Sequence, residues 1–122
     1  MKKLLVVLLC LGLVGCAGSP IRTTWQAGDH TRAMIKLKPD MTPEEVIKLM
    51  GNPDKTEMYR GKNEETVLVY LYITEGMDTF SRRWTDANYT PLVFENNKLA
   101  GWGWNYFNGT AQKYEFTIKN LY

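Results

Sequence analysis

Residues Thr66–Ile73 form a short run in which both alternating sets of side chains are apolar. In a β-strand, successive side chains point to opposite faces of the sheet. One set in this run is entirely aliphatic and the other carries two tyrosines, so both faces of such a strand need a cover. The run therefore predicts a central strand of a sheet that is covered on both sides.

Further strands are predicted on either side of this run. Residues 55–60 alternate weakly, and segments 89–95 and 98–107 flank Asn96-Asn97, a two-residue hairpin signal because asparagine tolerates positive φ. Asn108-Gly109 is a stronger version of the same signal, and it leads into an alternating segment at 112–118. We therefore predict an antiparallel meander of up to five strands, interrupted by a long polar connection at 74–88.

Two short helices are predicted before these strands. The better marked one begins with Thr42-Pro43-Glu44-Glu45, which supplies an N-cap hydroxyl, a proline at the first helical position and a glutamate at the third. It ends at Gly51, where left-handed φ costs little. The other helix covers residues 29–38, with Asp29 as its N-cap. The predicted fold class is α+β, with two short N-terminal helices packed on an antiparallel meander of three to five strands.

The N-terminus carries an export signal. Residues 1–3 are positively charged at two positions, and residues 4–14 form an apolar run too short for a membrane span, which needs about 20 residues. Leu13-Val14-Gly15-Cys16 closely resembles the lipobox of bacterial lipoproteins. That resemblance implies cleavage before Cys16, covalent diacylglycerol on its thiol and an acyl chain such as palmitate on its new amino terminus. The residue after this cysteine is Ala17. By resemblance to enterobacterial lipoproteins, the absence of an aspartate at this position implies sorting to the outer membrane.

The length of 122 residues suits one ordinary domain. We expect residues 1–15 to be a signal peptide, residues 16–28 to be the lipidated cysteine with a flexible tether, and residues 29–122 to be a single domain. Trp25 stands out in the otherwise small and polar tether. Two interpretations of it are open, because the side chain either folds back onto the domain or contacts a membrane or partner.

Charge and residue types argue against several functional classes. The 15 Lys and Arg residues include Lys2 and Lys3, and without those two the basic count equals the 13 acidic residues, so the body does not resemble a nucleic-acid binder. His30 is the only histidine, and Ser19 and Ser81 are the only serines. Of the two cysteines, Cys10 lies in the expected signal peptide, and the lipobox resemblance implies lipid on Cys16. We therefore expect no enzyme activity, no metal, no small-molecule substrate and no cofactor apart from the lipid.

Two segments around the better marked helix resemble the SmpA/OmlA group of small outer-membrane lipoproteins, which includes the BamE-like subunits of the β-barrel assembly machine. The segments read Asp40-Met41-Thr42-Pro43-Glu44-Glu45-Val46 and Leu49-Met50-Gly51-Asn52-Pro53-Asp54. Asp40 stands where the group has glycine, but aspartate tolerates a left-handed turn. The resemblance covers about residues 37–72 and implies a BamE-like fold. Residues 90–104 are similar to a stretch of uncharacterised lipoproteins with the same helix signature.

Two groups of residues are candidates for binding a partner. Trp102, Trp104 and Tyr106 alternate, which places them on one face of the predicted strand 98–107. There they either pack beneath the helices or form an exposed aromatic stripe. Arg82, Arg83 and Trp84 lie in the long connection, where arginine beside an aromatic side chain is typical of interface hot spots, and the alternative is a solvated loop.

Together these features predict a non-enzymatic lipoprotein that is anchored in the bacterial outer membrane and faces the periplasm. We expect it to bind protein partners in envelope assembly or integrity. The alternative is a ligand-recognising module, such as an inhibitor of a cell-wall hydrolase or a binder of a cell-wall glycan.

Overall fold

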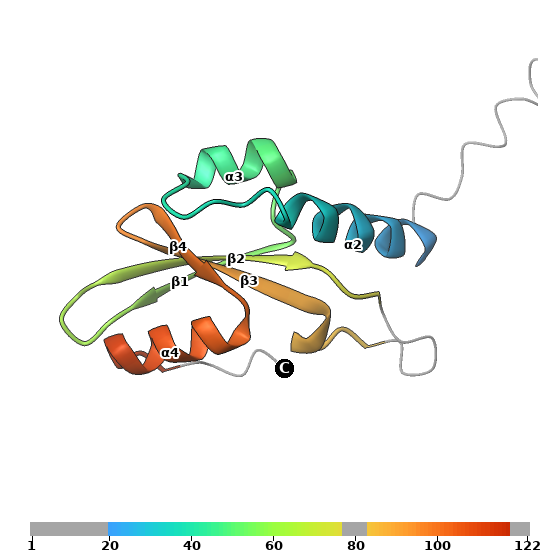
Figure 1. Cartoon of the computed structure of the whole chain (residues 1–122). Helices are drawn as coiled ribbons and strands as arrows, with labels where there is room; N and C mark the ends of the chain where they lie inside the picture. The colour runs from blue at the N-terminus through green and yellow to red at the C-terminus, as the bar shows by residue number, and fades with distance from the viewer. Residues whose placement is uncertain (1–19, 77–82, 118–122) are drawn as a thin grey trace, which may run out of the picture.

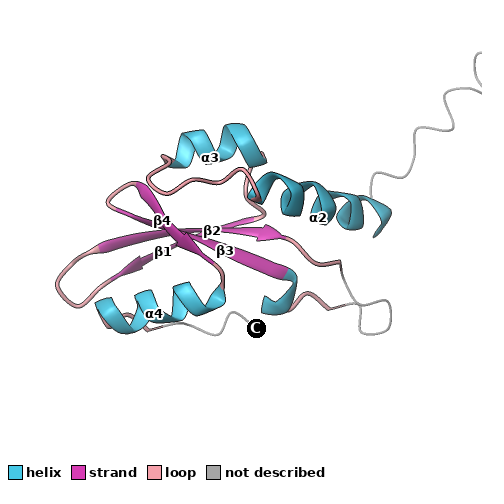
Figure 2. Ribbon diagram, viewed as in Figure 1, coloured by secondary structure: helices cyan, strands magenta, loops and turns pink. Residues whose placement is uncertain are grey.

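The computed structural model describes residues 20–76 and 83–117, which form an α+β domain (Figure 1). Four antiparallel strands make one sheet in the order β1-β2-β3-β4. Figure 2 shows α2 and α3 on one side of this sheet and α4 on the other. The predicted fold class is confirmed, with one further helix.

The elements in chain order are α2 (Pro20–Met34), α3 (Pro43–Met50), β1 (Lys55–Arg60), β2 (Thr66–Ile73), the 3₁₀ turn η2 (Asp86–Asn88), β3 (Tyr89–Glu95), β4 (Lys98–Trp102) and α4 (Trp104–Tyr114).

The central position of β2 is confirmed, because it pairs with β1 on one side and with β3 on the other. Its two sets of side chains enter two separate hydrophobic clusters, one on each face of the sheet. The cluster on the α4 side includes Val67, Val69, Leu71, Ile73, Val93, Phe107 and Ala111. The cluster on the α2 and α3 side includes Leu37, Val46, Met50, Tyr72, Leu92, Phe94 and Leu99.

Helix α3 and the β3–β4 hairpin have the local geometry that their sequences predict. The Thr42 hydroxyl accepts a hydrogen bond from the Glu45 N–H at 3.2 Å, and Gly51 ends the helix with φ of 82°. Asn96 and Asn97 have φ of 52° and 63°, which is the left-handed pair that a two-residue hairpin loop requires. Asp40 also adopts positive φ, 68°, as its place in a turn led us to expect.

The predicted strand at 112–118 is wrong, and the strand predicted at 98–107 ends at Trp102. Gly103, with φ of 94°, becomes the N-cap of α4, and Asn108-Gly109 lies on the exposed side of that helix instead of in a hairpin. Phe107, Thr110 and Ala111 are the buried residues of α4. Their three- and four-residue spacing places them on one face against the sheet. Tertiary packing thus overrides a local turn signal.

The predicted boundary between tether and domain is also displaced toward the N-terminus. Helix α2 begins at Pro20, so residues 20–28 are helical, and Asp29 lies inside the helix instead of capping it. Ala27 and His30 are buried, and they hold the C-terminal half of this helix against the rest of the domain. Within residues 20–76 and 83–117, no helix has both the length and the apolar composition that a bilayer crossing requires.

Candidate functional site

Two of the predicted binding residues, Trp102 and Tyr106, lie on opposite sides of strand β4. Trp102 is paired with Leu92, so it shares the α2 and α3 side of the sheet with that buried residue. Tyr106, in the first turn of α4, packs its ring over Gly101 so closely that a methyl group there would lie 2.6 Å from the ring. Both aromatic side chains remain 38% exposed. Each is therefore partly accessible beside β4, Trp102 on the α2 and α3 side of the sheet and Tyr106 on the α4 side.

Trp104 does not join them, so the single aromatic face predicted for Trp102, Trp104 and Tyr106 is wrong. Its indole N–H donates to the carbonyl oxygens of Asp86 and Tyr89 at 3.0 and 2.9 Å, and its ring meets Phe107 edge to face. These contacts fix the beginning of α4 against the turn before β3. The prediction failed because the strand period of two ends at Gly103, where the helical period begins.

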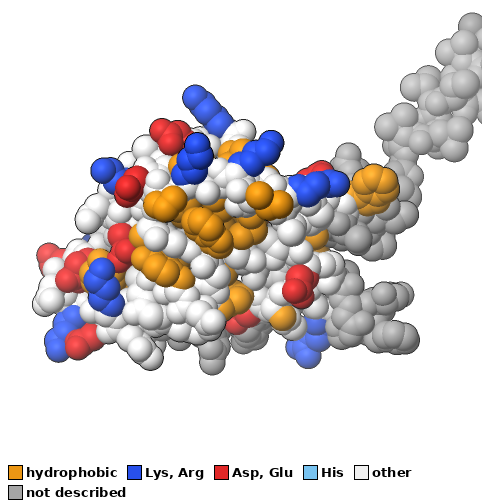
Figure 3. Space-filling model, viewed as in Figure 1, with side chains coloured by type: hydrophobic (Ala, Val, Ile, Leu, Met, Phe, Trp, Pro, Cys, Tyr) orange, Lys and Arg blue, Asp and Glu red, His pale blue; other side chains and the backbone are white. Residues whose placement is uncertain are grey.

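Strand β4 is an edge strand, and the loop before α3 covers only part of its outer edge. The Asp40 N–H donates to the Leu99 carbonyl at 2.9 Å, and the Leu99 N–H donates to the Met41 carbonyl at 2.7 Å. Figure 3 shows hydrophobic surface between α3 and β4, and Met41 is half-buried at the margin of the cluster beneath α3. We call Met41, Trp102 and Tyr106 the β4-edge surface.

The position of Tyr106 is stabilised by a polar network around Glu95. The Tyr106 hydroxyl donates to one oxygen of the Glu95 carboxylate at 3.1 Å, and the Lys113 ammonium lies 3.3 Å from the other. Burial alone would raise the pKa of Glu95, but hydrogen bonds from Tyr114, Lys113 and Tyr106 outweigh it and hold the pKa below its ordinary value. The ring of Tyr106 is therefore held from two sides, by Gly101 and by Glu95.

The second predicted group divides between surface and core. Arg82 lies outside the described residues, and Arg83 is exposed. Trp84 is half-buried and packs against the cluster on the α4 side, with its ring centroid 6.1 Å from that of Tyr89. Because Trp84 packs against the core, a structural role is favoured for it over a role as a partner anchor.

His30 and Asp54 form the polar cluster that most resembles a catalytic pair. Nδ1 of His30 lies 2.8 Å from the Ile73 carbonyl oxygen, which can only accept, so this nitrogen carries a proton. Asp54 accepts from the Ile73 N–H at 2.7 Å and from Gln26 at 3.0 Å, and its carboxylate is 3.8 Å from His30. Both side chains are thus used to hold α2 against the end of β2.

Serine and metal chemistry find no support around this cluster. Both serines, Ser19 and Ser81, lie outside the described residues. Over the described ranges 20–76 and 83–117, no three His, Cys, Asp or Glu side chains are grouped closely enough to hold a metal ion. The sequence places Asp54 directly after Gly51-Asn52-Pro53 and before the strand at 55–60, and this local pattern does not predict its contact with α2.

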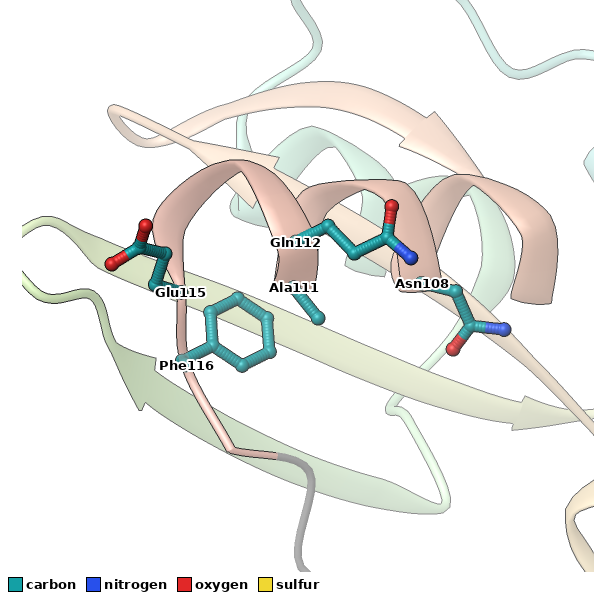
Figure 4. A pocket seen from close by; sticks show the side chains of 5 residues that line it. All are labelled: Asn108, Ala111, Gln112, Glu115 and Phe116. Carbon is teal, nitrogen blue, oxygen red and sulfur yellow. The ribbon is translucent and has the colours of Figure 1, made fainter.

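A shallow, open hollow lies beside α4, and its lining carries little chemistry (Figure 4). Ala111 and Phe116 supply its apolar part, while Asn108 and Gln112 are amides. Glu115 is its only charged residue, and its carboxylate is already paired with Lys62 at 2.9 Å. This hollow is therefore a weaker candidate for a site than the β4-edge surface.

Comparison with known proteins gives one match. A family model described as a protein of unknown function, DUF3192, matches residues 13–109, which is well over half of the chain. The chain belongs to the DUF3192 family. No curated protein and no solved structure matches it. The region that matches DUF3192 begins at Leu13 and so contains all four residues of the lipobox. It ends inside α4, and it includes Trp102 and Tyr106.

Proposed function

We propose that this DUF3192 protein is a non-enzymatic lipoprotein, held at the periplasmic side of the outer membrane by lipid on Cys16, whose domain binds a protein partner. The observation that carries this proposal is the lipobox Leu13–Cys16 directly after an apolar run too short to span a membrane. The family match supports it, because the matched region starts at the first lipobox residue. A role in envelope assembly or integrity follows from the resemblance to the SmpA/OmlA group.

Binding is favoured over catalysis because the described polar clusters, around His30 with Asp54 and around Glu95, are engaged in holding the fold together. His30 and Asp54 tie α2 to β2, and Glu95 positions Tyr106. The large side chains at the β4-edge surface remain partly exposed next to an edge strand. Partly exposed aromatic residues of this kind are the ones that become anchors when a partner covers them.

We assign the partner site to the β4-edge surface. Trp102 offers a large contact area at low conformational cost, since only two side-chain torsions must be fixed. Tyr106 is already held by Gly101 and Glu95, so binding loses little further freedom there. Met41 adds an adaptable thioether at the same edge.

The test is recovery of partners from crosslinked envelopes of cells that carry the full-length protein. Trp102→Ala is expected to weaken recovery of the bound protein tenfold or more, about 1.4 kcal/mol. Met58→Ala is the matched control, because Met58 is 69% exposed on β1, the strand at the other edge of the sheet. Equal recovery with Trp102→Ala and with wild type would contradict the assignment. Recovery of a hydrolase or peptidoglycan would favour the ligand-recognising alternative.

A further inference from the structure

We infer that the outer face of α2 lies on the lipid surface to which Cys16 is attached, with Trp25 in the headgroup region. The inference rests on the proposed lipid anchor and goes beyond it, because it specifies which side of the domain meets the membrane. It begins from Trp25, whose side chain is 71% exposed. The structure thus decides against the interpretation in which this tryptophan folds back onto the domain.

Trp25 differs from the other tryptophans of the domain in its surroundings. Trp84 and Trp104 are half-buried and pack against the cluster on the α4 side. Trp25 and Trp102 both lie outside the two hydrophobic clusters, but Trp25 is 71% exposed whereas Trp102 is 38% exposed. Indole side chains concentrate at membrane–water interfaces, where an apolar ring and a polar N–H are both accommodated. An exposed tryptophan close to a lipid anchor therefore fits an interfacial position.

The short chain between Cys16 and α2 keeps this helix close to the proposed anchor. Only three residues separate Cys16 from Pro20, where α2 begins. Four residue steps reach at most about 14 Å, and Trp25 lies about 8 Å further along the helix at about 1.5 Å per residue. The tether of 12 residues that the sequence predicts would have placed the domain further away, whereas the helix brings it to the bilayer surface.

The rest of the same helix face is compatible with a lipid surface. Gly28 and Arg32 follow Trp25 at intervals of three and seven residues, which places all three on one side of α2. Arg32 forms a 2.6 Å ion pair with Asp29, so the two charges compensate each other. Gly28 has no side chain, and a methyl group there would meet nothing closer than Arg32 at 4.0 Å. Over residues 25–34, the indole therefore has a glycine beside it and a compensated pair of charges on the same side of the helix.

The position of α2 in the molecule leaves this face free. Figure 1 shows the N-terminal half of α2 extending past the ends of the strands. The described buried residues of the helix, Ala27 and His30, point toward the domain, opposite to Trp25 and Arg32. With α2 lying on the bilayer, the two hairpin turns at the other end of the sheet point away from the anchor.

The test uses the full-length, processed protein incorporated into vesicles of phosphatidylethanolamine and phosphatidylglycerol. Some of these vesicles carry phospholipid with a nitroxide near the headgroup, which quenches nearby indole fluorescence. We expect part of the wild-type emission to be quenched, the Trp25→Ala variant to lose that quenched part, and Trp102→Ala to keep it. Because Trp25 is exposed, circular dichroism of Trp25→Ala should match that of wild type.

Vesicle flotation separates the two levels of the proposal. A wild-type protein that floats with the vesicles but shows no quenching, or a Trp25→Ala variant that is quenched as strongly as wild type, would overturn the membrane position of α2 alone. A wild-type protein that does not float and carries no lipid on Cys16 would overturn the anchor and this inference together.

Discussion

Asp54 connects three parts of the fold through one carboxylate. It accepts from the backbone of β2 at Ile73, from Gln26 of α2, and it faces His30. The sequence predicts the strand that follows this residue but not the contact with α2, because the partners are 24 and 28 positions away and no local pattern records them. Long-range polar contacts of this kind are the part of the site that a single sequence does not reveal.

Replacement of Asp54 should therefore release α2. In Asp54→Ala the Ile73 N–H and Gln26 lose a charged acceptor, and hydrogen bonds to charged groups are worth about 1.5–3 kcal/mol. We expect the free energy of unfolding, from urea titration of a chain lacking residues 1–16, to fall by about 2–3 kcal/mol. Asp29→Ala is the control, since its pair with Arg32 is exposed and should contribute about 0.5 kcal/mol or less. Equal losses in the two variants would contradict the role of Asp54.

Glu95 should make the domain sensitive to acid. Its pKa is lower in the folded protein than in the unfolded chain, so the ionised carboxylate stabilises the fold above the ordinary glutamate pKa. That contribution is lost as pH falls through the lower, folded-state value. Glu95→Gln should therefore lower the urea midpoint at neutral pH, and its difference from wild type should shrink in strong acid. A difference that does not change with pH would show that the charge of Glu95 is unimportant.

At the scale of elements, the sequence predicts the helices and strands that carry strong local signals. The cap of α3, the two-sided apolar pattern of β2 and the Asn96-Asn97 turn all reappear, because each depends on neighbours in the chain. Helix α4 is not predicted from the sequence, since its asparagines, glycine and threonine are weak helix formers and an isolated helix of 11 residues is only marginally stable. It forms by docking of Phe107 and Ala111 on the sheet.

The end of α4 also explains why the sequence suggested a strand there. Tyr114 and Phe116 both contact the cluster on the α4 side, although Phe116 lies beyond the helix. Glu115, between them, has φ of 53° and turns the chain. The two aromatic side chains thus alternate with charged ones because the turn at the end of α4 directs both of them to the same cluster, and not because the segment is a strand.

Gly61 should be essential for the docking of α4. A methyl group there would lie 3.0 Å from the Tyr114 Cβ and 3.1 Å from the Tyr114 carbonyl oxygen, which already accepts from the Lys62 N–H at 2.9 Å. Because a backbone atom cannot simply rotate away, we expect Gly61→Ala to destabilise the domain by about 1–3 kcal/mol in urea titration. Gly109→Ala is the control, since nothing lies within 4 Å of its position and alanine favours the helix. Stability equal to wild type in Gly61→Ala would contradict this contact.

At the scale of the whole molecule, the start of α2, next to the proposed lipid anchor, and the two hairpin turns lie at different ends of the domain. Helix α2 begins at one end of the domain, and the β1–β2 and β3–β4 turns lie at the other (Figure 1). Strand β4 lies between α3 and α4 (Figure 1), so the membrane contact that we propose for α2 would leave the β4-edge surface accessible to a partner. The sequence predicts the lipid anchor and marks the aromatic residues as candidates for binding. Only the fold shows that Trp25 and Trp102 are exposed whereas Trp104 is packed against the core.

The lipid on Cys16 is the claim on which the whole account depends, and palmitate labelling of the full-length protein in bacteria tests it most directly. We predict that the wild-type protein incorporates labelled palmitate and fractionates with the outer membrane. Cys16→Ser should lose both properties, while Cys10→Ser should keep them, since Cys10 lies in the segment that we expect cleavage to remove. An unlabelled wild-type protein, or a Cys16→Ser variant that is still labelled and still found in the outer membrane, would contradict the account.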